Sequence, residues 1–491
     1  MAVPYGGETL KSETEYVWKV YVWDKDGNQL ESSEEARFET GLSGDEWSGA
    51  CWIGIREPDP ADSDENVHYR AAYDVKLGRT YSGFCWGMDT NQYGEYLRCT
   101  FNTLGNDVVL TVSEFPDEEN DSYSVVLNQV FPDEFGDVET FCDGEHHMVL
   151  EVEGSSVCVD VDGVRVMETH VRKGRDVENV GFWTERGKYY AFYDNIHIVD
   201  LTDEKIVWEE DFHSGESNIF SPHYVRVVDG WCEASSGFIL TPGVEEPAPM
   251  LRRSFVSASD TRVLSARLYA TALGDYRIYF NGRDICGEYL TPGRSIYDRE
   301  TFYRTYDITE FVKAENAEEN VIGVILGHGR YDKSNADWGD QIAFQAKLVI
   351  QYEDGKCQTI VTDTEWQVYD DGPVRNDDMY LGEYYDATRE QAGWLDGNYA
   401  AEHWRSADLF PEYDVLSKRA AETTAVKQID TLMPVSVSEP VQGAYVYDFG
   451  QNFNGNCQII LRDTENKEGQ VITIRYAEAL NHENLSGCDD E

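Results

Sequence analysis

The sequence predicts an all-β chain built from several β-sandwiches in tandem, and three observations lead to this prediction. Apolar and polar residues alternate with a period of two in many short runs, such as 266–270 (ARLYA) and 276–280 (YRIYF), as half-buried strands do. Turn dipeptides follow some of these runs directly, as Asn281-Gly282 does, which is a hairpin signal. Helical periodicity is almost absent. Sheets packed on sheets are therefore the expected architecture.

Composition and turn signals divide the 491 residues into four units, within the range of three or four domains that this length allows. The first, 1–52, has two or three strands, too few to close a sandwich alone. The second, 53–245, begins with a Pro/Asp-rich linker and continues with many alternating strands. The third, 246–412, is predicted to be an antiparallel sandwich. The fourth, 413–491, has the first strands of a further sandwich.

In the first unit, the alternating run 16–23 ends at a turn that contains Asp24, Asp26 and Asn28. This spacing is similar to the start of an EF-hand calcium loop, but Gly27 falls at the fourth place, whereas the loop needs its Gly at the sixth. The sequence therefore favours a hairpin turn over a calcium site.

In the second unit, alternation predicts a series of strands, found at 69–75, 84–88, 96–101, 108–112, 147–152, 157–161 and 190–198. Asp194 and Asn195 interrupt the last run, where we expect a structural hydrogen-bonding pair at a strand bend. His146 and His147 open a strand without the spacing of a metal site.

In the third unit, the solid apolar run 321–326 predicts a strand covered on both faces. The following residues, 327–331 (GHGRY), predict a turn and not a phosphate-binding loop, because no helix follows them. Glu383 and Asp386 lie at a bend between predicted strands, and we expect them to fix that bend or a domain contact.

Several motifs of the third unit occur in one order: LRRSF at 251–255, GDYRIYFNG at 274–282, LTPG at 290–293 and GEYYDA at 382–387. In this order they resemble the N-terminal β-sandwich of bacterial α-L-rhamnosidases, the family 78 glycoside hydrolases. Thr388 stands where that family usually has Arg, which weakens a role for that Arg but not the resemblance.

The other units resemble parts of the same family. Residues 1–52 are similar to the end of its fibronectin-type-III-like module, and 53–245 looks like a concanavalin- or laminin-G-like jelly roll, a possible sugar-binding module. The motifs YDFGQN at 447–452 and IRYAEAL at 474–480 resemble the sandwich that precedes the catalytic barrel. The resemblance implies an inverting hydrolase of terminal α-L-rhamnosides in plant or bacterial glycans. Its catalytic carboxylates lie in a helical barrel that we expect to be absent from these residues, so no catalytic residue is assigned here.

A candidate sugar-binding site lies at 86–96, where Asp89, Asn91, Trp86 and Tyr96 combine carboxylate, amide and aromatic groups. Such groups bind sugar hydroxyls and sugar rings, and Asp and Asn oxygens are also ligands of Ca²⁺. In related enzymes a comparable stretch contacts rhamnose and Ca²⁺, so the resemblance implies Asp89 and Asn91 as metal ligands and rhamnose-containing glycans as partners. The alternative is that Asp89 and Asn91 only turn the chain.

Charge and composition limit the classes of partner. With 93 acidic and 40 basic residues the net charge is −53, which disfavours nucleic acid and anionic membranes. The ten cysteines are dispersed and contain no C-x-x-C pair, as expected for reduced thiols in a reducing or anaerobic setting. The first ten residues lack the pattern of a signal peptide, so a cytoplasmic bacterial protein is expected. No cofactor beyond Ca²⁺ is indicated.

Two further interpretations stay open. The chain could be a non-catalytic carbohydrate-binding or adhesion protein made of β-sandwiches, or a scaffold in which no sandwich binds sugar. Glycan binding by 53–245 separates these two interpretations from each other, and a catalytic domain in the same protein separates both from the hydrolase.

Overall fold

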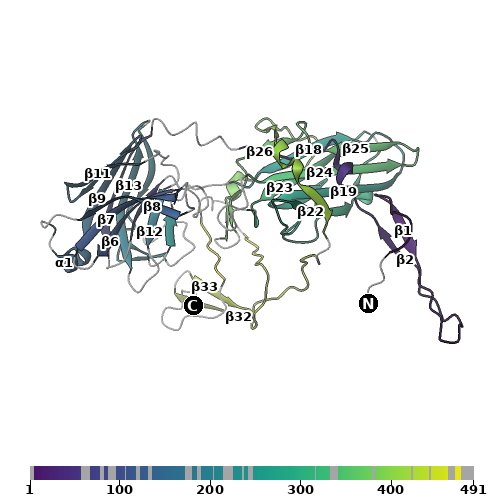
Figure 1. Cartoon of the computed structure of the whole chain (residues 1–491), viewed down its shortest axis with the longest axis horizontal. Coiled ribbons are helices and arrows are strands. Elements are labelled where there is room, and N and C mark those ends of the chain that lie inside the picture. Colours follow the sequence, from purple (N-terminus) through teal and green to yellow (C-terminus); the bar gives the residue numbers. More distant parts are fainter. Residues whose placement is uncertain are drawn as a thin grey trace. The chain divides into compact units, whose positions relative to one another are not determined.

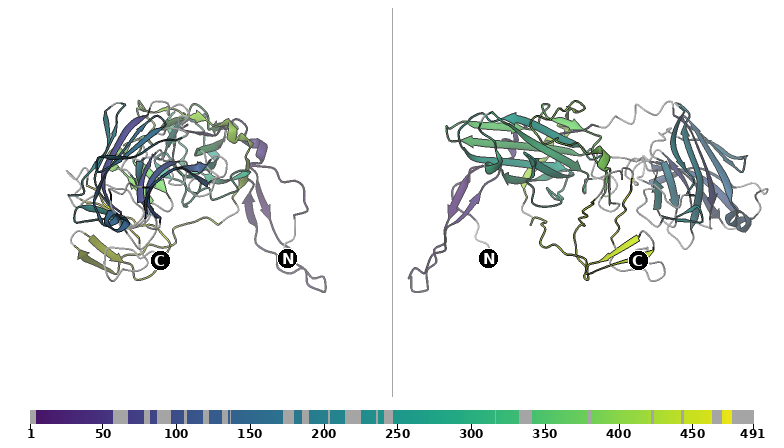
Figure 2. Two further views of the ribbon diagram at one scale, coloured as in Figure 1. Left: turned by 60° about the vertical axis from the view of Figure 1, so that its left-hand side comes forward. Right: turned by 180° about the vertical axis from the view of Figure 1, so that it is seen from behind.

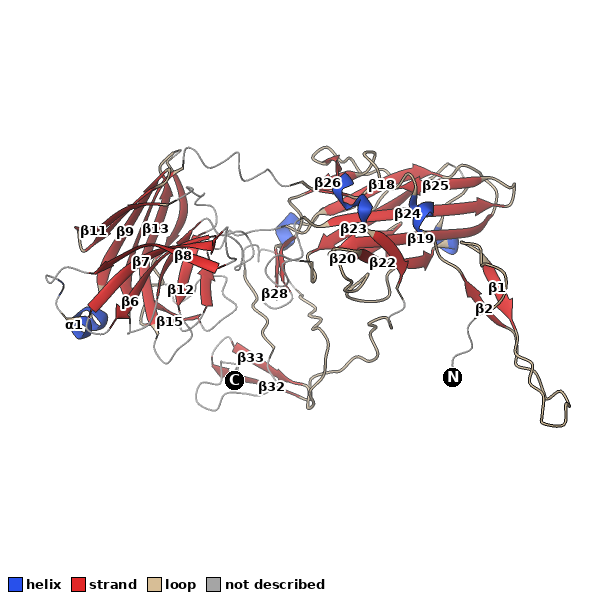
Figure 3. Ribbon diagram, in the orientation of Figure 1, coloured by secondary structure: helices blue, strands red, loops and turns tan. Residues whose placement is uncertain are grey.

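The computed structural model of this chain is built almost wholly from β-strands (Figure 1). It describes residues 5–56, 67–77, 82–86, 96–104, 107–117, 122–130, 135, 137–171, 180–184, 190–202, 204–213, 225–234, 237–240, 247–315, 317–331, 341–378, 382–421, 424–441, 444–462 and 470–476. The one α-helix in that part of the chain is α1 (Val138–Asp143), and short 3-10 turns supply the other helical residues there (Figure 3). The all-β prediction is confirmed.

The chain divides into two units of internal contacts. The first consists of Met1–Ile285 with Thr291–Glu422, and the second of Cys286–Leu290 with Thr423–Glu491. Each is described by itself. The first unit contains a short N-terminal ribbon and two sandwiches, which we call the insert (residues 67–240) and the main sandwich (residues 53–54 and 250–420).

The insert consists of an eight-stranded and a six-stranded antiparallel sheet (Figures 1 and 2). The eight-stranded sheet has the order β11-β10-β9-β4-β13-β16-β15, with β14 beside β13. Its strands are β4 (His68–Lys76), β9 (His146–Glu153), β10 (Ser156–Val161), β11 (Val164–His170), β13 (Ala191–Asp200), β14 (Lys205–Glu210), β15 (Val225–Val228) and β16 (Trp231–Ala234). The six-stranded sheet has the order β17-β12-β5-β6-β7-β8. Its strands are β5 (Ser82–Trp86), β6 (Tyr96–Leu104), β7 (Asp107–Asp117), β8 (Ser122–Val130), β12 (Val180–Thr184) and β17 (Gly237–Leu240).

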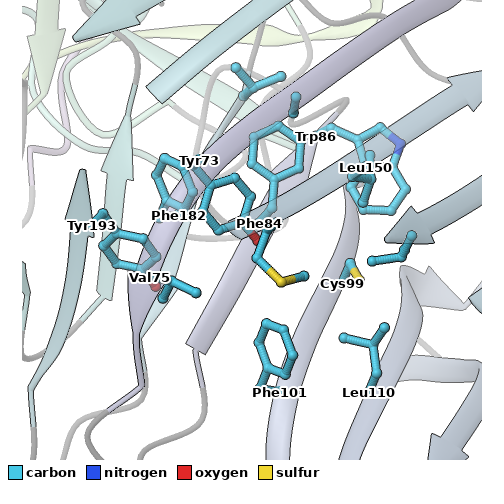
Figure 4. Packing of buried hydrophobic residues seen from close by; sticks show 14 of the residues in the cluster. Tyr73, Val75, Phe84, Trp86, Cys99, Phe101, Leu110, Leu150, Phe182 and Tyr193 are labelled. Atoms are coloured by element: carbon cyan, nitrogen blue, oxygen red, sulfur yellow. The ribbon is translucent and has the colours of Figure 1, made fainter. Parts of the chain in front are cut away.

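The core of the insert lies between these two sheets and is rich in aromatic rings (Figure 4). Tyr73 of β4 lies edge-on to Phe182 of β12 at 4.8 Å between ring centroids, and Phe182 also contacts Tyr193 of β13 at 4.3 Å. Each of these three rings is at most 2% exposed. Burial of one such ring stabilises the fold by roughly 1.5–3 kcal/mol, so the alternating strands of this segment fold around a core of their own.

The main sandwich also has two sheets, and their strand pairs are mainly antiparallel. The six-stranded one, in the order β21-β20-β23-β18-β26-β29, is formed by β18 (Met250–Val256), β20 (Asp275–Phe280), β21 (Arg283–Asp284), β23 (Glu319–Gly327), β26 (Gln367–Tyr369) and β29 (Arg405–Ser406). The seven-stranded one, in the order β30-β3-β24-β19-β22-β31 with β25 beside β24, is formed by β3 (Ile53–Gly54), β19 (Val263–Leu273), β22 (Glu300–Asp307), β24 (Ala343–Tyr352), β25 (Cys357–Val361), β30 (Asp408–Leu409) and β31 (Ser417–Ala420).

Strand β3 differs from the predicted domain boundary. The prediction assigned residues 53 and 54 to the insert, but Ile53 pairs with Phe344 of β24 and with Leu409 of β30 in the main sandwich. The neighbouring Trp52 is fully buried. A run of two strand residues has too little periodicity to be found in sequence, and the Pro/Asp-rich linker follows it. The insert thus interrupts the main sandwich between β3 and β18.

The main sandwich confirms the strand and turn predictions made for it. Strand β23 lies between β18 and β20, and residues 320–324 in it are all buried, as expected for a strand covered on both faces. After β20, Asn281 and Gly282 have φ values of 49° and 78° and join it directly to β21. Two consecutive residues with positive φ are the mark of a type I′ hairpin turn.

The N-terminal ribbon pairs β1 (Glu15–Trp18) with β2 (Ala36–Glu39). The loop beyond it confirms the predicted turn, because Asp24 Oδ1 accepts hydrogen bonds from the backbone N–H groups of Asp26 and Asn28 at 2.9 and 2.8 Å. The segment after β2 is attached to the main sandwich. Tyr303 Oη donates to the backbone oxygen of Leu42 at 2.8 Å.

The second unit contains the hairpin of β32 (Ser436–Val441) and β33 (Ala444–Asp448). An isolated bridge joins Tyr289 to Val426, which explains why residues 286–290 belong to this unit. Its larger apolar side chains are exposed, among them Val426, Ile429, Met433, Val435, Val437, Tyr445, Tyr447, Ile460 and Ile472. In neither unit is there, among the described residues, a helix long and apolar enough to cross a membrane.

Candidate carbohydrate-binding site

Two of the predicted sugar-binding residues, Trp86 and Tyr96, lie at the ends of strands in the six-stranded sheet of the insert. Strand β5 ends at Trp86 and β6 begins at Tyr96, and Trp86 pairs with Leu97, so the stretch between them connects two neighbouring antiparallel strands. Asp89 and Asn91 lie in that connection, outside the described residues, as does the Tyr96 side chain. The metal and sugar roles of Asp89 and Asn91 therefore stay predictions.

The prediction that Trp86 forms part of a sugar-binding surface needs correction. Its side chain is 0% exposed and its ring stacks on Phe84 at 6.1 Å, with an interplanar angle of 15° (Figure 4). A ring covered on both faces has no surface for a sugar. The sequence does indicate that Phe84 and Trp86 share one face of the strand, because they are two residues apart.

A polar cluster crosses the eight-stranded sheet of the insert at the predicted strand bend. Asp194 Oδ1 accepts from the backbone N–H of Asn195 at 2.8 Å, and Asn195 Nδ2 donates to Asp74 Oδ2 at 2.7 Å. The other oxygen of Asp74 lies 2.6 Å from His147 Nδ1. Burial raises the pKa of the Asp194 carboxyl. The β13–β4 register shifts at this point, which confirms the structural interpretation of Asp194 and Asn195.

The other histidine at the start of β9, His146, also contacts neighbouring groups of the insert. His146 stacks on Phe141 of α1 at 3.9 Å, and its Nδ1 and Nε2 lie 2.8 Å from Asp162 Oδ2 and 2.9 Å from the Phe141 backbone oxygen. These contacts fix α1 and the β10–β11 turn on the strand. Among the described residues, no group of three or more His, Cys, Asp or Glu side chains is arranged to hold a metal ion.

The outer face of the six-stranded sheet has polar residues that the sequence reasoning missed. The guanidinium carbon of Arg98 on β6 lies 4.0 Å from the ring centroid of Trp183 on β12. Thr111 Oγ1 of β7 donates to Asn128 Oδ1 of β8 at 2.6 Å on the same sheet. Alternation marks these residues as outward-facing, but the order of the strands across the sheet, which brings them together, cannot be derived from the alternation.

A group of carboxylates lies in the main sandwich, at the turn after β23. Asp377 of β27 (Val374–Asp378) accepts the backbone N–H of His328 at 2.9 Å, and its other oxygen lies 2.8 Å from His328 Nδ1. Burial raises the pKa of the Asp275 carboxyl to about 7. Asp377 adds to this rise and Arg330 opposes it. The segment after Gly327 is the predicted turn, since the N–H of Tyr331 donates to the His328 backbone oxygen at 3.0 Å.

The bend at the second family-like motif has the structural role that was predicted for it. Asp386 follows β28 (Gly382–Tyr385) and accepts from the backbone N–H and the hydroxyl of Thr388 at 2.9 and 2.7 Å. Arg389 Nη1 then donates to Asp371 Oδ1 at 2.6 Å, which ties the bend to the segment before β27. Burial raises the pKa of Glu383, and the nearby Asp377 adds to this effect.

Three family models match successive parts of the chain. Residues 1–44 match the "Rha78A-like, N-terminal immunoglobulin domain", 261–428 the "Alpha-L-rhamnosidase N-terminal domain", and 439–488 the "Bacterial alpha-L-rhamnosidase concanavalin-like domain". None of the three covers the insert. The main sandwich and the hairpin of the second unit thus each correspond to a family domain.

Similar whole proteins carry the same family name. An α-L-rhamnosidase of Streptomyces avermitilis is 26% identical over 98% of this chain and 45% of its own length. One of Alteromonas sp. is 32% identical over 61% of this chain and 31% of its own length. A crystal structure of the Streptomyces avermitilis α-L-rhamnosidase complexed with L-rhamnose aligns with a TM-score of 0.49 and 23% identity, over 92% of this chain and 42% of that one.

The present chain spans less than half the length of each of these relatives. The matched domains nevertheless follow one another along the chain in the order in which the sequence motifs predicted them. Residues 261–428 and 439–488 therefore match the N-terminal and concanavalin-like domain models of bacterial α-L-rhamnosidases, and the chain is similar to proteins of that name.

Proposed function

We propose that this chain is the supporting and sugar-binding part of an α-L-rhamnosidase that cleaves terminal α-L-rhamnosides of plant or bacterial glycans with inversion. The observation that carries the proposal is the succession of three rhamnosidase-family domains along one chain. In this proposal the catalytic carboxylates lie on a domain other than the sandwiches described above. The sandwiches support that domain.

The carboxylates of the main sandwich fit this proposal. Inverting glycosidases need two carboxyl groups about 6.5–9.5 Å apart, with an open space between them for sugar and water. Asp377 is instead bound to the turn that follows β23 through two contacts with His328. Asp386 is bound to the Thr388 turn. The hydrogen bonds of Asp377 and Asp386 therefore hold loops in shape.

We further propose that the insert binds L-rhamnose at the connection between β5 and β6, through Asp89, Asn91 and Tyr96, with Ca²⁺ held by Asp89 and Asn91. Carboxylate and amide oxygens suit both a sugar hydroxyl and this cation. The net charge of −53 also favours a cation or a neutral sugar over a polyanion such as nucleic acid. Trp86 is not part of this proposal, because it is buried.

Calorimetric titration of the 491-residue protein with L-rhamnose tests the binding proposal. We expect saturable heat in Ca²⁺ that is lost with EDTA and in the Asp89→Ala variant. Asp26→Ala, which changes an exposed carboxylate in a hairpin turn of the N-terminal ribbon, is the matched control and should bind as the wild type does. Absence of heat with rhamnose would contradict the binding proposal.

Hydrolysis of a chromogenic α-L-rhamnoside by the same protein tests the supporting role. We expect no release of the chromophore above the uncatalysed rate. Turnover by the 491-residue protein would instead place catalytic groups within it and overturn the assignment of the chemistry to another domain.

A further inference from the structure

The β27–β28 hairpin belongs to neither of the two sheets of the main sandwich. In the described part of the chain, its two strands pair only with each other. Two backbone hydrogen bonds fix its base: the N–H of Ala248 donates to the Val374 oxygen at 3.0 Å, and the N–H of Asp386 donates to the Pro373 oxygen at 2.7 Å. The hairpin is therefore an appendage of the sandwich and not a part of its sheets.

Near the end of β27, Asp377 attaches the hairpin to the turn that follows β23. Its carboxylate accepts the backbone N–H of His328 at 2.9 Å, and its other oxygen lies 2.8 Å from His328 Nδ1. A Cβ on Gly327 would collide with Asp377 Oδ2, so the carboxylate lies directly against the backbone of the turn. Asp377 is thus a second point of attachment, away from the base of the hairpin.

A second carboxyl group, that of Asp275, lies against the same turn. Asp275 begins β20 and pairs with Gly327, the last residue of β23. A Cβ on Gly329 would lie 2.6 Å from Asp275 Cγ, which shows how closely this carboxyl approaches the turn. One carboxyl from the sandwich and one from the hairpin, that of Asp377, therefore meet at one short turn.

A third carboxyl group lies beside Asp377 within the hairpin. Glu383 of β28 is the direct partner of Asp377 in the β27–β28 register. Like charges at directly opposite positions of an antiparallel pair are destabilising. The partial burial of Glu383 raises the pKa of its carboxyl, and Asp377 adds to this rise. The hairpin thus brings two acids towards the turn, where the sandwich already has one.

The charged groups that act on Asp275 belong to different elements. Burial raises the pKa of Asp275 to about 7, Asp377 of the hairpin adds to this rise, and Arg330 of the turn opposes it. Asp275 in turn raises the pKa of the Tyr297 phenol, an effect that Arg294 and Arg330 oppose. If the hairpin left the turn, Asp275 would lose an acidic neighbour and keep Arg330, so ionisation of Asp275 favours this release.

We propose that the β27–β28 hairpin is a pH-sensitive arm of the main sandwich, held on the turn after β23 while Asp275 is neutral and released from that turn when Asp275 is ionised. A carboxyl whose pKa is raised in the attached state favours attachment fully below about pH 4, and this contribution is lost as the pH rises through about 7. The inference stands on the contacts of the main sandwich alone and does not depend on the proposed glycosidase function.

Hydrogen exchange of the 491-residue protein and its Asp275→Asn variant, at pH 5 and pH 8, tests the arm. At pH 8 the amides of residues 374–378 should be at least about threefold more protected in Asp275→Asn than in the wild type, which corresponds to about half a pKa unit. At pH 5 the two proteins should differ less. Comparison at one pH cancels the intrinsic exchange rate and any change at His328, because both are common to the two proteins.

Two controls separate release of the hairpin from unfolding of the sandwich. The amides of β19 should stay far more protected than those of the hairpin at both pH values, and Asp354→Asn should behave as the wild type does, since hydrogen bonds lower the pKa of Asp354. If Asp275→Asn loses the native melting transition, Asp275→Ala replaces it. Equal protection of the hairpin in the wild type and a folded Asp275 variant at pH 8, or hairpin amides as protected as those of β19, would overturn the inference.

Discussion

At the scale of single residues, the main sandwich shows how burial changes a charged group. Arg252 is 3% exposed, and burial lowers the pKa of its guanidinium. Its nitrogens donate to the backbone oxygens of Trp394 and Asp396, each at 3.1 Å. It therefore attaches a long connecting segment to the sheet. Asp275 is largely buried too, and the charge of another acid, Asp377, adds to the rise of its pKa, which has a consequence for stability.

Asp275 should make the stability of the protein depend on pH. Its pKa is raised from 3.8 to about 7 by burial and by Asp377. A carboxyl whose pKa is raised in the folded state contributes stability that is fully present below pH 4 and is lost as the pH rises through 7. Asp275→Asn, which stays neutral, should raise the stability at pH 8 relative to the wild type, by at most about 4 kcal/mol at 1.36 kcal/mol per pKa unit.

Denaturant unfolding of both proteins at pH 4.5 and pH 8 measures this difference. The difference between the two proteins at pH 8 should be much larger than the one at pH 4.5. Asp354→Asn serves as the control, because hydrogen bonds from Lys356 and Ser259 lower the pKa of Asp354. The same gain from Asp275→Asn at both pH values would contradict the ionisation argument.

At the scale of elements, sequence periodicity predicts the strands but not the contacts between residues on different strands. Alternation places Leu97 and Cys99 inside and Arg98 outside from sequence alone. It also predicts that Phe84 and Trp86 share one face, although not that this face is the core. The proximity of Arg98 to Trp183 depends on β5 lying between their strands, and the pairing of Ile53 with Phe344 joins residues far apart in the sequence.

The hairpin between β20 and β21 allows a direct test of local turn chemistry. Gly282 has a φ of 78°, in the left-handed region, so a Cβ there is strained even though no atom lies near it. Gly282→Ala should lower the free energy of unfolding by about 1–2 kcal/mol. Gly6→Ala, at an open position without positive φ, should leave it unchanged in the same denaturant titration. Equal effects of the two substitutions would contradict the strain argument.

At the scale of the whole first unit, the N-terminal segment and the main sandwich share a small apolar cluster. It consists of Leu42, Trp47, Tyr269, Tyr303 and Val349, all of them at most 9% exposed. Arg267 reinforces it, since its Nε lies 3.0 Å from both carboxylate oxygens of Glu39 at the end of β2. The segment after the ribbon is therefore packed as part of the sandwich.

Removing the largest ring of this cluster should loosen the N-terminal segment. Trp47→Ala deletes a side chain that is 3% exposed, and it should cost about 3–5 kcal/mol, since large-to-small changes in a core leave a cavity. Trp18→Ala, at a ring that is 50% exposed in the ribbon, should cost much less. Hydrogen exchange of residues 40–54 reports the loosening directly, and unchanged protection there in Trp47→Ala would contradict the shared cluster.

The position of β3 also has a consequence for the order in which the sandwiches fold during synthesis. Ile53 is synthesised before the insert, but its partners, Phe344 and Leu409, are synthesised long after it. An insert with a core of its own can fold first and draw its two ends together. This shortens the effective loop that the pairing of Ile53 with Phe344 must close, and closing a shorter loop costs less chain entropy. The interrupting sandwich would thus act as an intramolecular folding aid for the one that it divides.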